Sequence, residues 1–298
     1  EPALDPDLDL DVLDEIQQRI LWLAIRMVDS ANHDRDTGDG VKVGGHQASS
    51  ASLVTALTAL YFAHLDAADR VAIKPHASPV FHSIQYLLGQ LDRSYLTRLR
   101  ELGGLQSYPS RTKDPDNVDF STGSVGLGPV APLFAALTRR YVDDHFGQRD
   151  HSRFIAFMGD AELDEGNIWE AIADQATQGL GNVTWVVDFN RQSLDRVVPG
   201  VKVHQWQVQF LAAGWQVIEV KYGRKLQAKF KEANGEDLRA WIDAGANWPE
   251  TAGVVTTKSD HWAYNAPRRP AVPEGAQGKA QSSKLKAQNP IDAFVLAR

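Results

Sequence analysis

Two short apolar runs, each followed at once by polar residues, constrain most strongly how this chain can fold. Residues 154–158 precede a Gly-Asp-Ala-Glu sequence, and residues 183–187 precede Asp-Phe-Asn. Apolar runs of this length, rich in β-branched and aromatic residues, predict buried strands, and residues 164–178 between them predict a helix. Strand, helix and strand in close succession predict a βαβ unit with parallel strands and a right-handed crossover.

The polar residues that follow these strands include Asp160 and Asn190, which should lie at the same end of the sheet. Open α/β sheets bind ligands at the carboxyl ends of their strands, and hard oxygen donors suit a Mg²⁺ or Ca²⁺ ion that carries a phosphate. The amides near Gly159 and Ala161, at a predicted helix start, suit a phosphate oxygen. The same residues also fit an Asp that caps a helix and an Asn in a turn, so spacing alone leaves both interpretations open.

The remaining pattern alternates helical and extended segments, which indicates an α/β fold with a mostly parallel sheet and helices on both faces. Residues 103–126 are rich in Gly, Pro, Ser and Asp and predict a long irregular loop, which in a compact domain is usually functional or disordered. The other predicted helices cover residues 12–28, 50–65, 79–90, 94–102, 127–145, 206–213 and 226–244, and the other predicted strands cover residues 69–74 and 215–220.

Composition excludes several classes of protein. The 298 residues carry a formal charge of −7, which argues against a nucleic-acid-binding body, and no run of apolar residues is long enough to predict a membrane span. The absence of cysteine excludes disulfides, thiolate zinc sites and a Cys nucleophile. With no signal segment recognised, we expect a cytoplasmic protein: a lead-in over residues 1–10, an α/β domain over 11–250, and a Pro-, Ala- and Lys-rich tail of unknown role over 251–298.

Histidines and glycines in loops mark further candidate positions. His46 follows two glycines and His76 lies in a Pro- and Ser-containing loop; each could be a surface or capping residue, but together they favour a polar site. His82 is expected to be structural. The glycine-rich stretch 120–129 opens a predicted helix, which suits close approach of the backbone to a ligand, although such clusters often only make turns.

These motifs together resemble one family. The Gly-Asp at 159–160 followed by Asn190 is similar to a thiamine diphosphate and magnesium motif. The resemblance, which covers residues 10–222, is to the N-terminal, diphosphate-binding domain of transketolases and of homodimeric-type pyruvate dehydrogenase E1, and is closer to E1. Its other motifs lie at residues 45–46, 75–78, 106–109 and 124–129, and the segments most like E1 are residues 107–109, 160–165 and 190–195.

The resemblance implies a role for each matching residue. Asp160 and Asn190 would bind the metal through their side chains and Gln192 through its main-chain carbonyl. His46 and His76 are implied as catalytic residues, with His46 facing the substrate. Ala161 departs from the family, which usually has a second glycine there. The implied cofactor contacts are His76, Tyr108, Gly123, Val125, Gly159, Asp160, Ala161, Glu162 and Asn190.

The resemblance implies an enzyme that uses thiamine diphosphate with Mg²⁺ or Ca²⁺ and acts on a 2-oxoacid such as pyruvate. The alternative is a transketolase that moves two-carbon ketol units between sugar phosphates, and a further alternative is a truncated domain without activity. The glutamate that activates the cofactor in this family lies in a pyrimidine-binding domain, which we expect a partner chain to supply. We therefore expect a homo- or hetero-oligomer and no activity from the isolated chain.

Overall fold

The structure is a computed structural model. It describes residues 8–38, 40–147, 151–190, 192–193, 196–197 and 200–243. Packing divides the chain into two compact units, residues 1–236 and 237–298, of which the second is described only over residues 237–243. The predicted tail, residues 251–298, lies outside the described residues.

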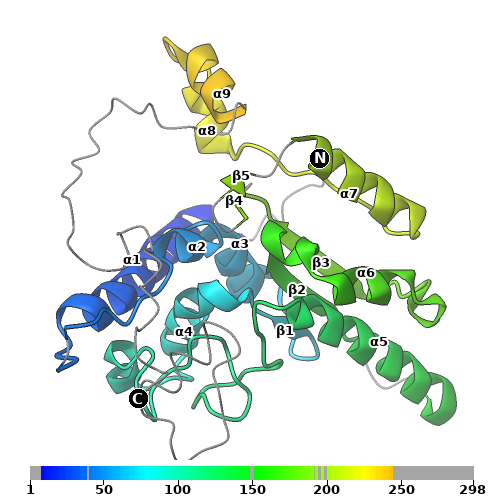
Figure 1. Cartoon of the computed structure of the whole chain (residues 1–298), viewed down its shortest axis with the longest axis horizontal. Helices are drawn as coiled ribbons and strands as arrows, with labels where there is room; N and C mark the ends of the chain where they lie inside the picture. Colours follow the sequence, from blue (N-terminus) through cyan, green and yellow to red (C-terminus); the bar gives the residue numbers. More distant parts are fainter. Residues whose placement is uncertain are drawn as a thin grey trace, which may run out of the picture. The chain divides into compact units, whose positions relative to one another are not determined.

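Three parallel strands form the sheet of the first unit (Figure 1). The strands are β1 (Arg70–Ala72), β2 (Phe154–Gly159) and β3 (Val183–Asp188), with β2 in the middle. The register of β2 and β3 runs from Phe154 opposite Val183 to Gly159 opposite Asp188. The predicted parallel strand–helix–strand unit is confirmed, although the helix between the strands, α6 (Gly166–Ala173), is shorter than predicted and is flanked by 3₁₀ turns.

Helices cover both faces of this sheet (Figure 1). Ile155 and Phe157 of β2 pack against residues of α1 (Leu10–His33), α3 (Val54–Ala59) and α4 (Ser78–Leu87). Met158 packs on the opposite side, in a cluster with residues of α6, α7 (Gly200–Ala212) and α5 (Leu127–Phe146). The alternation follows from the two-residue period of a strand and confirms the predicted α/β fold class.

Several helix boundaries differ from the predictions for local reasons. Helix α1 begins at Leu10 because the Asp9 carboxylate accepts hydrogen bonds from the amides of Asp11 and Val12, which caps the helix. The predicted helix over 50–65 is divided into α2 (Gln47–Ala51), α3 and a π-helical turn.

The predicted helix over 94–102 was wrong beyond its first turn. A 3₁₀ turn covers Arg93–Thr97. After it, the amide of Arg100 donates to the Leu105 carbonyl at 2.7 Å and the amide of Leu105 donates to the Arg98 carbonyl at 3.0 Å. These bonds take the backbone groups that a continuing helix would need, so the chain turns into the long loop.

The segments after β3 differ most from the predictions. Two antiparallel strands of two residues each, β4 (Gln192–Ser193) and β5 (Arg196–Val197), precede α7. The strand predicted over 215–220 was wrong: this segment has no sheet partner among the described residues, and an apolar run becomes a strand only where its backbone groups pair. The helix predicted over 226–244 is two helices, α8 (Arg224–Lys229) and α9 (Gly235–Asp243).

Within the described parts of the chain, no helix combines the length and apolarity needed to cross a membrane.

Candidate functional site

The carboxyl ends of β2 and β3 carry the two predicted metal ligands. Asp160 directly follows β2 and is 1% exposed, whereas the Asn190 side chain, two residues beyond β3, is exposed. Gly159 and Asp188 are register partners, so the turns that carry Asp160 and Asn190 leave the same edge of the sheet. A carboxylate and an amide oxygen are donors of the kind that Mg²⁺ and Ca²⁺ take.

The described residues contain no cluster of three or more His, Cys, Asp or Glu side chains that could hold a metal ion. The predicted metal ligands are of another kind: the side chains of Asp160 and Asn190 and the main-chain carbonyl of Gln192. The Gln192 backbone lies in β4, opposite Val197 of β5.

The turn after β2 buries a second carboxyl group, that of Glu162. The Gly159 amide donates to Glu162 Oε1 at 3.2 Å, and Oε2 is buried without a hydrogen-bond partner. Burial raises the pKa of Glu162 to about 7, against the opposing effect of the Gly159 hydrogen bond and the Lys74 charge. A neutral Glu162 carries one O–H donor, and Oε2 is the oxygen that has no partner.

Lys74 brings a buried cation to the same edge. It follows β1, is 5% exposed, and its Nζ lies 2.8 Å from Asp188 Oδ2. The Ser52 hydroxyl donates to the same oxygen at 2.6 Å. An ideal Cβ on Gly159 would lie 3.3 Å from Lys74 Cε, so the lysine stem passes close over the end of β2.

His46, His76 and Tyr108 form a contiguous group of rings. The ring centroids of His46 and His76 lie 4.3 Å apart, and those of His76 and Tyr108 lie 5.4 Å apart, both in edge-on geometry. The sequence placed these residues in three separate loops, and the structure brings them together. Their catalytic and cofactor-binding roles remain predictions.

The surroundings of both histidines favour the neutral imidazole. Burial, followed by the charges of His46 and Lys74, lowers the pKa of His76 to about 4. The His46 side chain is exposed, but partial desolvation, followed by the charges of Arg100 and Lys74, also lowers its pKa. His76 Nδ1 is buried without a hydrogen-bond partner, so it is available to a bound ligand as a donor or acceptor, depending on the tautomer.

The glycine-rich loop lies against the turn after β2. The Asn167 side chain donates to the Val125 carbonyl at 2.9 Å. Gly126 has a φ of +79°, and a Cβ at this residue would come too close to the Asn167 amide oxygen. A residue with a Cβ would be strained there and would overlap that oxygen. Val125 is half exposed and Gly123 is partly buried, which leaves the backbone of this loop accessible to a ligand.

Aspartates anchor the long loop that carries Tyr108. The Asp114 carboxylate accepts from the amides of Gln106 and Ser110 at 2.8 and 2.7 Å. His82 Nδ1 lies 2.7 Å from Asp116 Oδ2, and both side chains are fully buried, as expected of a structural histidine. Loop 103–126 is therefore ordered by polar contacts rather than by regular secondary structure.

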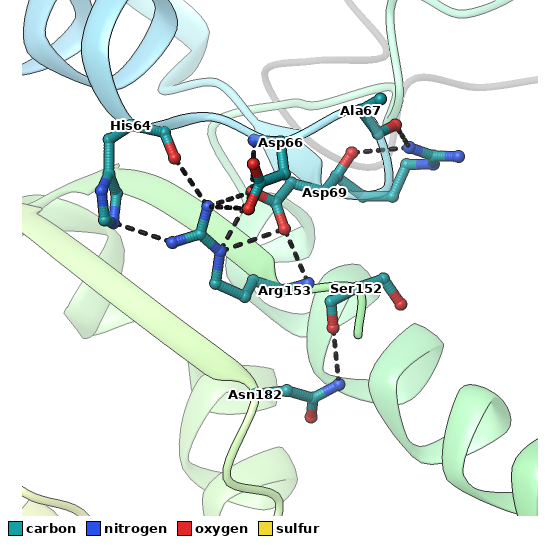
Figure 2. A network of polar contacts seen from close by, with 8 residues as sticks. His64, Asp66, Ala67, Asp69, Ser152, Arg153 and Asn182 are labelled. Carbon is teal, nitrogen blue, oxygen red and sulfur yellow. Dashed lines mark hydrogen bonds and ion pairs between the residues drawn. The ribbon is translucent and has the colours of Figure 1, made fainter. Parts of the chain in front are cut away.

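A separate polar network joins the amino ends of β1 and β2 (Figure 2). Arg153 Nη2 lies 2.5 Å from Asp69 Oδ2, and the Arg153 amide donates to Asp69 Oδ1 at 2.9 Å. A hollow of about 760 Å³ adjoins this network, but its arginines are engaged by Asp69, Asp143 and main-chain carbonyls. This end of the sheet is built for structure and lies away from the candidate site.

Sequence reasoning did not single out Lys74, Asp188, Ser52 or Asn167. A lysine before a proline and an aspartate at the end of a strand carry no spacing signature, and their partners are distant in sequence. Asp188 was at the end of a predicted strand beside a predicted ligand, which was the one signal that could have drawn attention to it.

A parallel α/β sheet with a buried carboxylate and an amide side chain just beyond the carboxyl ends of neighbouring strands belongs to the class of α/β domains that bind ligands at that edge. The sequence matches the family described as the transketolase thiamine diphosphate-binding domain over residues 43–237, and the chain belongs to that family.

The relatives agree with this assignment. The chain is 36% identical over 232 residues to a pyruvate dehydrogenase E1 component from Mycolicibacterium smegmatis, covering 73% of this chain and 24% of the relative. It is 30% identical over 327 aligned positions to the pyruvate dehydrogenase E1 component of Escherichia coli, covering 96% of this chain and 36% of the relative. The chain thus spans about a quarter to a third of the length of these proteins.

Solved structures share the fold. A transketolase from Leishmania mexicana superposes with a TM-score of 0.60 at 20% identity, covering 79% of this chain and 35% of the transketolase chain. At this identity the likeness concerns the fold alone.

Proposed function

We propose that this chain is the diphosphate-binding part of a thiamine diphosphate-dependent enzyme of the pyruvate dehydrogenase E1 type, which decarboxylates a 2-oxoacid and transfers the acyl group. Two observations carry the proposal: Asp160 and Asn190 follow neighbouring strands at one sheet edge, and His46 and His76, from separate loops, are in ring contact. The identity of 30–36% to pyruvate dehydrogenase E1 components favours this reaction over ketol transfer, since the likeness to the transketolase structure concerns only the fold.

In this proposal Asp160, Asn190 and the Gln192 carbonyl hold a Mg²⁺ or Ca²⁺ ion that anchors the diphosphate. The backbone at Gly159, Ala161 and Glu162 faces the phosphate oxygens, and Gly123 and Val125 lie along the rest of the cofactor. Oxygen donors and main-chain amides fit such a group, because a metal requires hard donors and a diphosphate requires amide hydrogens.

In this proposal His46, His76 and Tyr108 are the protein groups that contact the cofactor or the substrate. Bound thiamine diphosphate supplies a stabilised carbanion at the reacting carbon. His76 and Tyr108 contact the cofactor, and His46, which is exposed, faces the substrate and can donate to a carbonyl oxygen as charge develops. A pyrimidine-binding domain from a partner chain completes the site, so the isolated chain binds the cofactor without turnover.

Calorimetric titration of thiamine diphosphate in the presence of Mg²⁺ tests the binding proposal. We expect the wild-type chain to bind and Asp160→Asn to lose the Mg²⁺-dependent part of the binding, because one anionic donor is removed. Asp164→Asn is a matched control in the same turn, where Asp164 pairs with Lys202, and should bind as the wild type does. Equal binding by Asp160→Asn and the wild type would contradict the assignment.

Reconstitution tests the reaction. With a pyrimidine-binding domain added, we expect release of CO₂ from pyruvate and no transfer of ketol units between sugar phosphates. Ketol transfer without decarboxylation would favour the transketolase alternative. Cofactor binding without either reaction would favour a non-catalytic domain.

A further inference from the structure

The Lys74–Asp188 ion pair at the cofactor edge has no part in the functions assigned above. Lys74 is 5% exposed, and the two side chains are 7% and 12% exposed in the pair. Asp188 Oδ2 accepts from both Lys74 Nζ at 2.8 Å and Ser52 Oγ at 2.6 Å. One carboxylate oxygen therefore joins three segments of the chain: the loop after β1, the junction of α2 and α3, and the end of β3.

The pair crosses the middle strand of the sheet. Lys74 extends from the β1 side and Asp188 ends β3, with β2 between them. The lysine stem passes over Gly159, where a Cβ would meet Lys74 Cε at 3.3 Å. The residue after Gly159 is Asp160, so the ion pair spans the sheet edge directly before the predicted metal ligand.

The two partners also lie next to residues of the proposed site in sequence. Lys74 precedes His76 by two residues, and Asp188 precedes Asn190 by two residues. A shift of either partner would therefore move the backbone that carries a histidine or a metal ligand. The Ser50 hydroxyl, which contacts the His76 carbonyl at 3.4 Å, ties the same loop to α2.

We propose that Lys74 and Asp188 act together as positioning residues, which hold Asn190 and the His76 loop at the spacing that the cofactor and its metal require. The proposal rests on the proposed binding of thiamine diphosphate. The pair is needed as a unit: removing one charge leaves the other buried and unpaired, whereas a neutral hydrogen-bonded pair keeps the link across β2 at a lower cost of burial.

A double-mutant cycle on cofactor affinity tests this coupling. The variants are Lys74→Gln, Asp188→Asn and the double variant, and the readouts are the Kd for thiamine diphosphate and the Mg²⁺ concentration for half-saturation. We expect each single variant to weaken binding by about tenfold to hundredfold, as loss of a residue that orients a ligand does. We expect the double variant to bind within about threefold of the wild type, because the two effects are not additive.

Asp69→Asn provides the matched control. Asp69 is a buried aspartate that pairs with a cation and links two strands, but at the amino ends of the sheet (Figure 2). We expect it to lower the thermal midpoint as the single site variants do, with cofactor affinity unchanged. If Lys74→Gln and Asp188→Asn also lowered only stability, the pair would be merely structural and the inference would be overturned.

Ser52→Ala gives a milder version of the same test, since Ser52 is exposed and its loss should not prevent folding. It removes one hydrogen bond to Asp188 Oδ2, and we expect roughly threefold weaker cofactor binding with only a small fall in the thermal midpoint. Unchanged affinity in this variant, or additive effects in the double variant, would overturn the inference. Failure of the wild-type chain to bind would instead remove the proposed function, and the inference with it.

Discussion

The buried carboxyl of Glu162 makes the stability of this chain depend on pH in an unusual direction. Its pKa rises from 4.5 to about 7 because the group is buried, with one oxygen bonded to the Gly159 amide and the other without a partner. The folded chain therefore keeps this proton between about pH 4.5 and 7, where the unfolded chain has lost it. The contribution to stability is fully present below pH 4.5 and is lost as the pH rises through 7.

Replacing Glu162 with Gln removes the ionisation and keeps an oxygen that can accept from the Gly159 amide. The difference between the two pKa values corresponds to about 3 kcal/mol of unfolding free energy across the window. Relative to the wild type, Glu162→Gln should therefore gain about 2–3 kcal/mol in unfolding free energy between pH 5 and pH 8. The sign follows from burial, since the wild type must bury a charge at pH 8 and the variant need not.

Urea denaturation between pH 5 and pH 8, followed by the fluorescence of the eight tryptophans, measures this difference without cofactor or metal. Glu170→Gln, at an exposed position of α6, is the control and should run parallel to the wild type. Parallel curves for Glu162→Gln and the wild type would refute the reasoning, because they would mean that Glu162 ionises in the folded chain as it does in the unfolded one.

Three further predictions concern single positions. Gly126→Ala should lower the free energy of unfolding by about 1–3 kcal/mol and weaken cofactor binding, because φ is +79° and the space that a Cβ would take is filled. Gly147→Ala, at φ +83° in open space, should show the backbone cost alone. Equal shifts of the urea midpoint in the two variants would contradict the packing argument. In an NMR titration the His76 ring should change protonation near pH 4, and a midpoint of 6 or above would disprove its burial. His82→Leu should cost about 2 kcal/mol or more by leaving Asp116 unpaired in the core, with faster proteolysis of the long loop; an unchanged cleavage rate would show that the pair does not anchor it.

The sequence predicted the central part of the fold because there the local pattern and the tertiary contacts agree. The apolar runs at 154–158 and 183–187 lie in β2 and β3, and the sheet places their polar successors at one edge. Residues 215–220 carry a similar apolar pattern, yet no described strand pairs with them. Strand propensity is a property of one segment, whereas a sheet forms only where a second segment pairs with it.

The candidate site likewise contains residues that the sequence could predict and residues that it could not. Loop motifs were enough to nominate His46, His76 and Tyr108, which the structure brings into contact. The pairing of Lys74 with Asp188 could not be predicted, because a charge that is buried and a charge that is solvated look identical in sequence. Only the packing of β1, β2 and β3 determines which of the two applies.

The hydrogen bonds to Asp188 also bear on the order in which the chain folds. Ser52 and Asp188 are 136 residues apart, and Lys74 and Asp188 are 114 apart. Contacts between such distant residues form late, since the entropy of closing a long loop opposes them. Helices α1, α3 and α4 can associate with β1 through apolar contacts while β3 is still being synthesised. The carboxyl edge of β2 and β3 therefore forms only after most of the packing around β1 is in place, and a nascent chain that ends before β3 lacks both Asp188 and Asn190.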